Sequence, residues 1–333
     1  MTIRYSGIAL PLAEKALIAQ IRRAAGKVRG RRIVAGIGDD CAVLRLPRAH
    51  DSLVTTDFSL EGVHFRRDWH PALSVGHRCL ARGLSDIAAM GGEPVAAFLS
   101  LALPRDLAQA WVNDFMRGLI RLAKTHGVTL AGGDTAESPR GILADIVVVG
   151  SVPKGKAVLR SAARPGDGIF VSGELGGSAA TLARLRAGSI KAGPASQREF
   201  RRHFYPEPRI ELGRALREKK LASAMIDTSD GLSTDLAHIC EESGVGAQID
   251  GSLVPRAPGG RGGLQVDLDL ALHGGEDYEL LFTVPEGRRL PAKIAGVPVT
   301  RIGRVTSGKK ILLRGLDGGV TNFSPQGWEH FRK

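Results

Sequence analysis

The segment that most constrains this chain is Gly36–His64, GIGDDCAVLRLPRAHDSLVTTDFSLEGVH, where aspartates stand beside glycine and a short β-type run. A glycine before the Asp39-Asp40 pair allows a tight turn and a close approach to a ligand. The β-branched run Ser52–Thr56 predicts a strand that stops where Asp57 begins. Carboxylates at such places offer the hard oxygen ligands that Mg²⁺ prefers. For one aspartate alone, an Asx-turn or a strand cap is the simpler interpretation, so the metal hypothesis depends on repetition.

The same design of apolar segment, small residues and aspartate recurs along the chain. A predicted strand over 128–131 ends before Gly132-Gly133-Asp134-Thr135, and one over 223–226 ends before Asp227-Thr228-Ser229-Asp230-Gly231. A helix predicted from Pro71 to Met90 carries Asp86 on a semi-apolar face, where an unpaired buried carboxylate would be costly. Asp230 could instead cap the helix that follows it. The acidic positions of this design are Asp39/Asp40, Asp57, Asp86, Asp134, Asp227 and Asp230.

So many acids in small-residue turns, in a chain of net charge +12, indicate a converging acidic centre. Repulsion between the carboxylates must be offset by cations. Several Mg²⁺ ions that bridge a polyphosphate would do so, and phosphoryl transfer is the matching reaction class. The chain contains neither a Walker A motif nor a protein-kinase catalytic loop, so neither common nucleotide-binding pattern applies.

At 333 residues the chain is long enough for two domains, and Lys154-Gly155-Lys156 resembles a linker. We therefore predict domains at residues 1–152 and 153–333. In the second, a strand, the glycine loop Gly173–Ser178 and a helix follow one another, an order that can present a helix N-terminus to phosphate. The loop matches neither common phosphate-binding spacing, so tight packing is an equal alternative.

The positive charge raises the alternative of a nucleic-acid-binding protein. Arginines cluster at 22–32 and 198–203, but aromatic residues make up only 5% and do not alternate with them. A solvated basic surface, or attraction for an anionic small substrate, explains the charge with fewer assumptions. No apolar run is long enough to span a membrane, and no signal-peptide order opens the chain. Three scattered cysteines without a CxxC predict a reducing, cytoplasmic location.

Eight motifs occur in order: GIGDDCAVL, LVTTDFSLEGVHF, RGLSDIAAMGGEP, AGGDTAESP, RPGDGIFVSGELGGS, IDTSDGLSTDL, HGGEDYELLFTVP and GWEHF. With them the chain resembles the thiamine-monophosphate kinase family over essentially its whole length. That family lies within the ATP-binding superfamily of aminoimidazole ribonucleotide synthetase and selenophosphate synthetase. The TTD–GVHF and GGEDYELLFT pieces point to the thiamine-phosphate branch. One local departure is RHFYPEPRI, where the family usually has RHLRPxPRI.

The resemblance implies an α/β (α+β) fold of two synthetase-like domains, with the N-terminal sheet pairing across a homodimer. It also implies which residues bind Mg²⁺, ATP and thiamine monophosphate. Among the Mg²⁺ ligands, Asp40, Asp86 and Asp227 would be catalytic. The implied metal positions are Asp40, Thr55, Thr56, Asp57, Asp86, Asp134, Asp227 and Asp230. The implied ATP contacts are Gly133, Asp134, Arg160 and Ser229, and the implied substrate contacts are His64, Glu276 and Trp328.

The implied reaction is Mg²⁺-assisted, in-line transfer of a phosphoryl group from ATP to thiamine monophosphate, which yields ADP and thiamine diphosphate. The acceptor is a phosphate oxygen, already largely ionised at neutral pH, so it needs no general base. The nearest alternative is another superfamily reaction, the phosphorylation of a formamide or thiocarboxylate oxygen or of selenide. The selenide alternative is weakened because the chain has no Cys or Lys in a glycine-rich N-terminal segment. The expected partners are ATP, thiamine monophosphate and a second copy of the chain, without nucleic acid or membrane.

Overall fold

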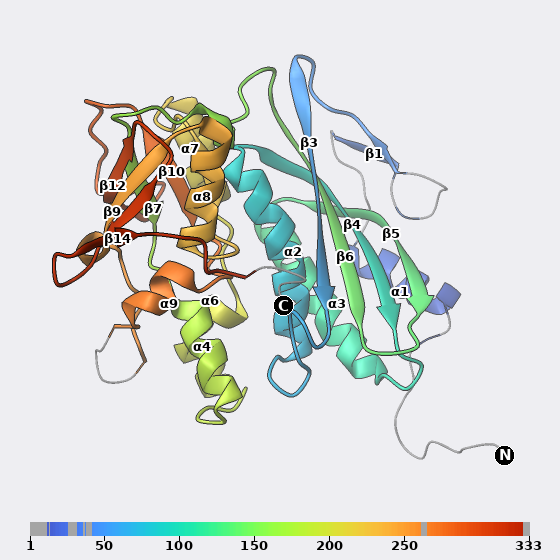
Figure 1. The fold of residues 1–333 in the computed structure, drawn as a ribbon. Helices are drawn as coiled ribbons and strands as arrows, with labels where there is room; N and C mark the ends of the chain where they lie inside the picture. Colours follow the sequence, from blue (N-terminus) through green and yellow to red (C-terminus); the bar gives the residue numbers. More distant parts are fainter. Residues whose placement is uncertain are drawn as a thin grey trace. The chain divides into compact units, whose positions relative to one another are not determined.

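A computed structural model describes residues 12, 14–25, 32–35, 37, 42–260 and 265–328 of the chain (Figure 1). The chain forms two compact units: unit 1 comprises Met1–Gly83 and Pro94–Ser151, and unit 2 comprises Leu84–Glu93 and Val152–Lys333. Asp39 and Asp40 lie outside the described residues. The domain boundary after residue 152 stays a prediction, because a division by contacts does not test independent folding.

Unit 1 is built on a four-stranded sheet in the order β3-β6-β4-β5, with β4 and β5 parallel. A separate pair, β1 and β2, is antiparallel. The elements, of which α2, β4 and β6 extend past the boundaries of unit 1, are α1 (Glu14–Ala25), β1 (Ile33–Ala35), β2 (Val43–Leu44), β3 (His50–Leu60), α2 (Ala72–Ala89), β4 (Glu93–Leu103), α3 (Gln109–Thr125), β5 (Thr129–Glu137) and β6 (Leu143–Pro153).

Helices α2 and α3 pack closely because each has a glycine at the crossing. A Cβ on Gly76 of α2 would lie 1.9 Å from the backbone oxygen of Phe115, and one on Gly118 of α3 would lie 1.9 Å from that of Leu73. Helix α2 also contacts the sheet, since a Cβ on Gly83 would lie 2.6 Å from Cγ2 of Val148 on β6. Any larger side chain at these positions would separate the layers.

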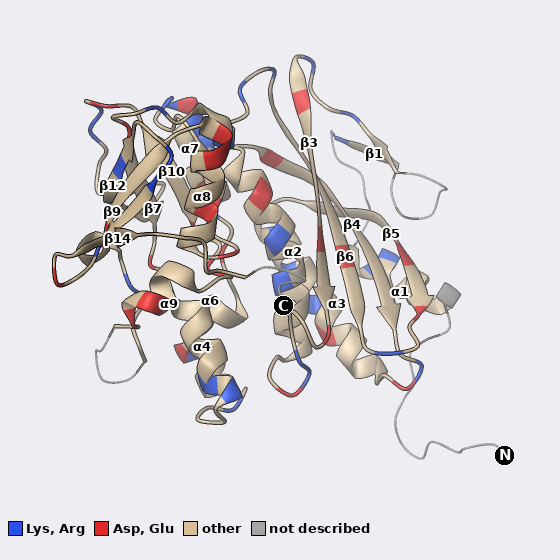
Figure 2. Cartoon of the chain, in the orientation of Figure 1, with Lys and Arg blue, Asp and Glu red and all other residues tan. Residues whose placement is uncertain are grey.

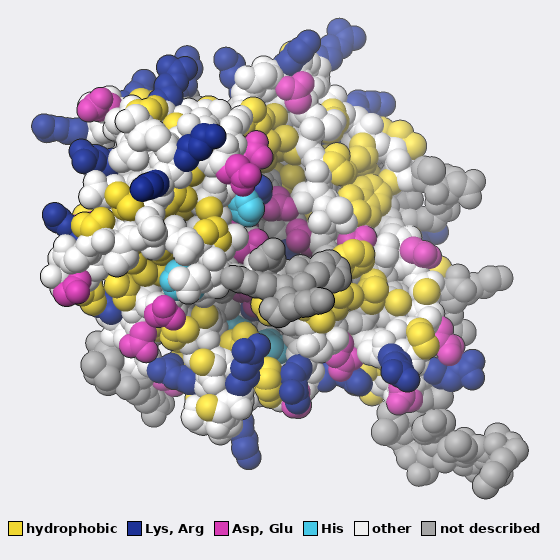
Figure 3. Space-filling model, in the orientation of Figure 1, with side chains coloured by type: hydrophobic (Ala, Val, Ile, Leu, Met, Phe, Trp, Pro, Cys, Tyr) yellow, Lys and Arg dark blue, Asp and Glu magenta, His cyan; other side chains and the backbone are white. Residues whose placement is uncertain are grey.

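Within the described residues, β3 has an exposed face, which we call the open face of the sheet, whereas Ile33 of β1 packs against Val95, Ala96 and Ala131. Along β3, Leu53 and Ser59 are buried, whereas Val54 and Phe58 point the other way and are 67% and 54% exposed. This alternation follows from the two-residue period of a strand. Figure 3 shows hydrophobic side chains gathered over the strands of unit 1.

Two strands are longer than their sequences predict. The strand predicted to stop before Asp57 continues to Leu60, and the strand predicted to end at residue 131 continues to Glu137. Both predictions were wrong for the same reason: a neighbouring strand outweighs a local turn signal. In β5, the ladder to β4 runs through Gly133 opposite Leu99 and Asp134 opposite Ser100. Gly133 fits there because a Cβ on it would lie 1.9 Å from the oxygen of Leu99.

Unit 2 contains, in its described residues, an eight-stranded sheet in the order β14-β13-β9-β12-β7-β10-β8, with β11 paired to β12. The pair β9 and β13 is parallel, whereas β7, β8, β10 and β12 pair antiparallel. The strands are β7 (Gly168–Ser172), β8 (Met225–Asp227), β9 (Gly246–Asp250), β10 (Leu280–Val284), β11 (Lys293–Ile294), β12 (Val297–Thr306), β13 (Ile311–Arg314) and β14 (Val320–Asn322).

The helices of unit 2 lie between these strands in the sequence. They are η1 (Arg160–Ala162), α4 (Gly177–Arg186), α5 (Pro194–Glu199), α6 (Arg201–Phe204), α7 (Ile210–Glu218), α8 (Leu232–Ser243), η2 (Gly251–Leu253) and α9 (Leu268–His273). One core joins α8 to the sheet, with Leu236 and Ile239 of α8 buried together with Ile226 and Leu281. No helix in the described ranges is long and apolar enough to cross a membrane.

The two residues that differ from the usual run of the family, Phe204 and Tyr205, lie at the end of α6. The unusual Phe204 is fully buried, and the hydroxyl of Tyr205 donates a hydrogen bond to Oε1 of Gln197 (2.7 Å). Both side chains therefore hold the α5–α6 segment in place.

Candidate functional site

The acidic loop of unit 2, Asp227–Gly231, follows directly on the buried strand β8. Asp227, the last residue of β8, is buried, and its Oδ2 accepts a hydrogen bond from the Ser85 hydroxyl (2.7 Å). Ser85 and Asp86 are adjacent on the part of α2 that belongs to unit 2. The structure thereby places two predicted metal ligands, Asp86 and Asp227, on segments joined by one hydrogen bond.

A second segment, which we call the GEDY turn (Gly275–Tyr278), lies along this loop. The backbone N–H of Glu276 donates to the oxygen of Ser229 (2.8 Å), and that of Tyr278 donates to the oxygen of Thr228 (2.9 Å). Glu276 and Tyr278 have φ angles of +66° and +52°. This left-handed conformation costs a non-glycine residue of order 1–3 kcal/mol. The surrounding contacts must supply that free energy, and such over-determined turns are typical of functional sites.

A third segment, the C-terminal strap (Gln326–Trp328), crosses the same loop. Three backbone N–H groups of the strap donate hydrogen bonds: Gln326 to the Ser233 hydroxyl (3.3 Å), Gly327 to that of Thr234 (3.1 Å) and Trp328 to the oxygen of Asp230 (3.1 Å). The side chain of Trp328 is 51% exposed. Predicted ATP, metal and substrate positions, namely Ser229, Asp230, Glu276 and Trp328, therefore meet in unit 2.

The acids of this loop repel one another. Burial, and then the carboxylates of Asp227 and Asp230, raise the pKa of Asp235 well above its usual range. Oδ2 of Asp235 accepts the N–H of Gly231 (3.0 Å), and Gly231, not Asp230, is the N-cap of α8. A buried cluster with excess negative charge is the chemical setting that a divalent cation neutralises. Asp227 and Asp230 are thus donors of the chemical type that Mg²⁺ prefers, although by themselves they form no complete ligand set within the described residues.

In unit 1, the predicted ligands on β3 separate onto two faces. Thr55 faces α2, since its Cγ2 would lie 3.6 Å from a Cβ on Gly83, and Asp57 shares that face. Thr56 points to the open face, where its hydroxyl donates to Oδ1 of Asp145 (2.7 Å). Adjacent residues on a strand point to opposite faces, so the Thr56 side chain does not join the other two.

The remaining predicted positions in unit 1 lie on β5 and after β3. Oδ1 of Asp134 accepts the N–H of Thr135 (2.8 Å), and Asp134 is exposed on β5 beside Gly133. His64 closes the turn after β3, where its Nδ1 accepts the N–H of Leu60 (3.0 Å). This bond places the proton of a neutral His64 on Nε2.

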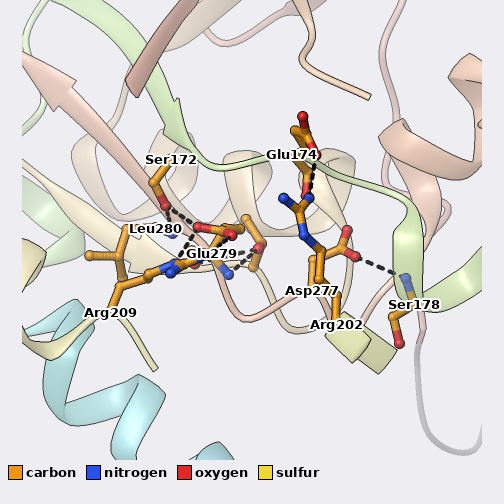
Figure 4. A network of polar contacts seen from close by, with 9 residues as sticks. Ser172, Glu174, Ser178, Arg202, Arg209, Asp277, Glu279 and Leu280 are labelled. Atoms are coloured by element: carbon orange, nitrogen blue, oxygen red, sulfur yellow. Dashed lines mark hydrogen bonds and ion pairs between the residues drawn. The ribbon is translucent and has the colours of Figure 1, made fainter. Parts of the chain in front are cut away.

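Two further predicted features lie elsewhere in unit 2. Arg160 is exposed on η1, and its backbone oxygen accepts the Ser243 hydroxyl (2.7 Å). The glycine loop before α4 is filled by a side chain of the protein itself. Oδ2 of Asp277 accepts the N–H of Gly176 (2.6 Å), and Oδ1 accepts that of Ser178 (3.2 Å) (Figure 4). This contact within the protein agrees with the alternative that the loop serves tight packing.

Ser85, Asp235 and Asp277 are site residues that the sequence reasoning missed, although all three lie inside the quoted motifs. Within the described ranges, no group of three or more His, Cys, Asp or Glu side chains is arranged to hold a metal ion. Asp40 lies outside those ranges, and the Mg²⁺ site stays a prediction.

Comparison with known families defines the class of this protein. Residues 38–152 match the family model described as AIR synthase related protein, N-terminal domain, and residues 164–314 match the corresponding C-terminal domain. The two halves of the chain thus match the two domains of the synthetase-like fold, one domain each.

Individual relatives narrow the class. The thiamine-monophosphate kinase of Escherichia coli K12 is 40% identical over 321 residues, which cover 93% of this chain and 97% of that protein. The crystal structure of thiamine-monophosphate kinase from Stenotrophomonas maltophilia K279a has a TM-score of 0.81 at 37% identity and covers 93% and 98% of the two chains. The structure of AaThiL complexed with AMPPCP and TMP has a TM-score of 0.75 at 33% identity and covers 99% of each. The chain belongs to the thiamine-monophosphate kinase family.

Proposed function

We propose that this chain is a thiamine-monophosphate kinase, which transfers the γ-phosphoryl group of ATP to the phosphate of thiamine monophosphate. The observation that carries the proposal is the meeting of three motif segments in unit 2: the acidic loop, the GEDY turn and the C-terminal strap. The relative complexed with AMPPCP and TMP supports ATP and thiamine monophosphate as the two substrates.

The chemistry requires charge cancellation and alignment. The acceptor is a phosphate oxygen that is mostly ionised at neutral pH, so the chain need not supply a general base. The residues must instead bring two polyanions together in line, at a distance short enough for attack. Transfer then breaks the bond between the γ-phosphorus and the bridging oxygen of ATP and forms a bond to the acceptor oxygen. The products are ADP and thiamine diphosphate, without a phosphoenzyme.

We assign the cation sites to the predicted acidic positions. Asp40, Asp86 and Asp227 would be central, with Thr55, Asp57, Asp134 and Asp230 completing the set; the Thr56 side chain faces the other side of the sheet and is left out. Mg²⁺ held by these residues would supply positive charge against the reacting phosphates. The Ser85 hydroxyl fixes the Asp227 carboxylate, and Asp235 fixes the N–H of Gly231, so both residues hold the loop in which the ligands lie.

We assign the substrate contacts to two groups. Gly133, Asp134, Arg160 and Ser229 would contact ATP, where the Arg160 guanidinium offsets phosphate charge. His64, Glu276 and Trp328 would contact thiamine monophosphate. The half-exposed Trp328 ring offers a π-face to the cationic thiazolium, an interaction worth about 1–2 kcal/mol.

We further propose a homodimer that forms through the open face of the sheet in unit 1. Val54 and Phe58 expose large apolar side chains there. Figure 3 shows hydrophobic side chains gathered over the strands of unit 1. Large apolar side chains exposed on a sheet face, as on β3 within the described residues, are typical of a subunit interface. We also propose a cytoplasmic location, which the free, buried thiols of Cys79 and Cys240 fit.

Turnover with alternative acceptors tests the assignment. ADP release is measured at fixed Mg·ATP with thiamine monophosphate, free thiamine and a formamide ribonucleotide in parallel. We expect thiamine monophosphate to be the fastest acceptor. Faster phosphorylation of either other compound would overturn the substrate assignment and leave the family unchanged.

The alternative of nucleic-acid binding is not favoured. Lys and Arg are spread over helices, strands and loops of both units, with Asp and Glu among them (Figure 2). A salt-dependent affinity for random duplex DNA would be its signature, and we expect none at physiological ionic strength.

A further inference from the structure

The Asp277 carboxylate joins two parts of unit 2 that are distant in sequence. It accepts the N–H groups of Gly176 and Ser178 at the start of α4, about one hundred residues earlier in the chain. Figure 4 shows the side chain directed at this backbone. The first N–H groups of a helix have no partner within it, and the helix dipole favours an anion there. Asp277 satisfies both requirements.

The residue sits at the centre of the GEDY turn. Its two neighbours, Glu276 and Tyr278, have left-handed backbones, and their N–H groups bind the acidic loop on the other side. The turn is therefore held from two directions: by backbone hydrogen bonds to Ser229 and Thr228, and by one carboxylate to α4. On the α4 side, the carboxylate accepts two backbone N–H groups and so opposes relaxation of the left-handed residues.

We propose that Asp277 is a positioning residue that fixes the backbone at Glu276 for recognition of thiamine monophosphate. The identity of the substrate in this inference rests on the proposed function, whereas the contact between Asp277 and α4 is independent of it. It is distinct from the acid two positions later, because Glu279 is bound by Arg209 (Nε to Oε2, 2.8 Å) and by the Ser172 hydroxyl (2.5 Å). The charge of Glu279 is therefore paired with the Arg209 guanidinium, whereas the Asp277 carboxylate accepts hydrogen bonds from uncharged backbone N–H groups.

The charge environment makes this contact sensitive to pH. Burial raises the pKa of Asp277 to about 7; the two N–H donors and Arg202 lower it, and Glu279 raises it. Arg202 is itself paired with Glu174 (2.6 Å), which limits its effect. A protonated carboxyl accepts fewer N–H groups, so the contact to α4 is complete above pH 7 and weakens below it.

Hydrogen exchange tests the contact without substrates. In Asp277→Asn, the amides of segments 173–180 and 274–280 should exchange about tenfold faster at pH 8 than in the wild-type protein. Glu211→Gln removes an exposed acid of α7 and should leave both segments unchanged. In the wild-type protein itself, protection factors of Gly176 and Ser178 should fall from pH 8 to pH 6. If the variant and the wild-type protein were equally protected, the proposed contact would be overturned. If the variant does not fold, wild-type protection that is the same at pH 6 and pH 8 would overturn it.

Steady-state kinetics test the positioning role. We expect Asp277→Asn to raise KM for thiamine monophosphate about tenfold at pH 8, with KM for ATP changed less than about twofold. The ratio of the two KM values for thiamine monophosphate, variant to wild type, should shrink toward one at pH 6, where the wild-type carboxyl is largely protonated. Faster exchange with unchanged KM would refute positioning, and a wild-type protein inactive on thiamine monophosphate would refute the proposed function alone.

Discussion

Replacing Gly327 by alanine would place a methyl group 1.9 Å from the backbone oxygen of Asp230 and 2.6 Å from Oγ1 of Thr234. Ordinary contact needs about 3.5 Å, so the C-terminal strap would have to move by roughly 1.5 Å. That displacement breaks the hydrogen bonds from Gly327 to Thr234 and from Trp328 to Asp230. Each contributes about 0.5–1.5 kcal/mol, so docking of the strap weakens by about 1–3 kcal/mol.

A loss of that size lowers the equilibrium constant for docking by about 5- to 150-fold, and the docked fraction of the strap by about 3- to 80-fold if docking is otherwise near balance. Because apparent affinity scales with the competent fraction, KM for thiamine monophosphate should rise at least about threefold. Global stability should change little, with a Tm shift below about 4 °C, since the strap is a short surface segment.

The assay measures ADP release at varied thiamine monophosphate and saturating Mg·ATP. The matched control is Gly193→Ala, because a Cβ on Gly193 meets no atom within 4 Å and its φ of −108° suits alanine. A Gly327→Ala enzyme with KM within twofold of wild type would show that the strap does not position Trp328 for the substrate.

Three other predictions follow from the site and the sheet. Activity should require Mg²⁺, and Asp86→Asn should lower kcat by about 100-fold or more while the circular dichroism spectrum stays native; near-normal turnover would contradict the shared metal centre. Trp328→Ala should raise KM for thiamine monophosphate more than KM for ATP, and equal changes would argue against an aromatic contact to the thiazolium. Sedimentation at micromolar concentration should give a dimer, and Phe58→Glu beside Val54 should give monomers; a wild-type monomer of 35.3 kDa would rule out the interface.

Local patterns in the sequence determined much of the fold. The helix predicted from Pro71 to Met90 is α2, which spans Ala72–Ala89, because apolar spacing and the Gly91-Gly92 stop are encoded within a few residues. The aspartate motifs likewise carried the family resemblance, which the relatives confirm.

Strand extent and side-chain direction could not be predicted in the same way. Asp57 and Asp134 were expected just beyond strand ends, yet they lie within β3 and β5 because neighbouring strands continue the ladder past the turn signals. The two threonines of the TTD motif were assigned together, but Thr56 faces the open side of the sheet. A partner strand decides these features, and no local window contains it.

The sequence by itself determined which residue types are present at each motif, and hence the class of chemistry. Only the tertiary structure decided that the acidic loop, the GEDY turn and the C-terminal strap meet, since about fifty residues separate each from the next. It also decided the role of Asp277, a residue that could have been a solvated neighbour of Glu276 but instead fills the start of α4. The physical reason is that hydrogen bonds between distant backbone groups form only once the core has brought the segments together.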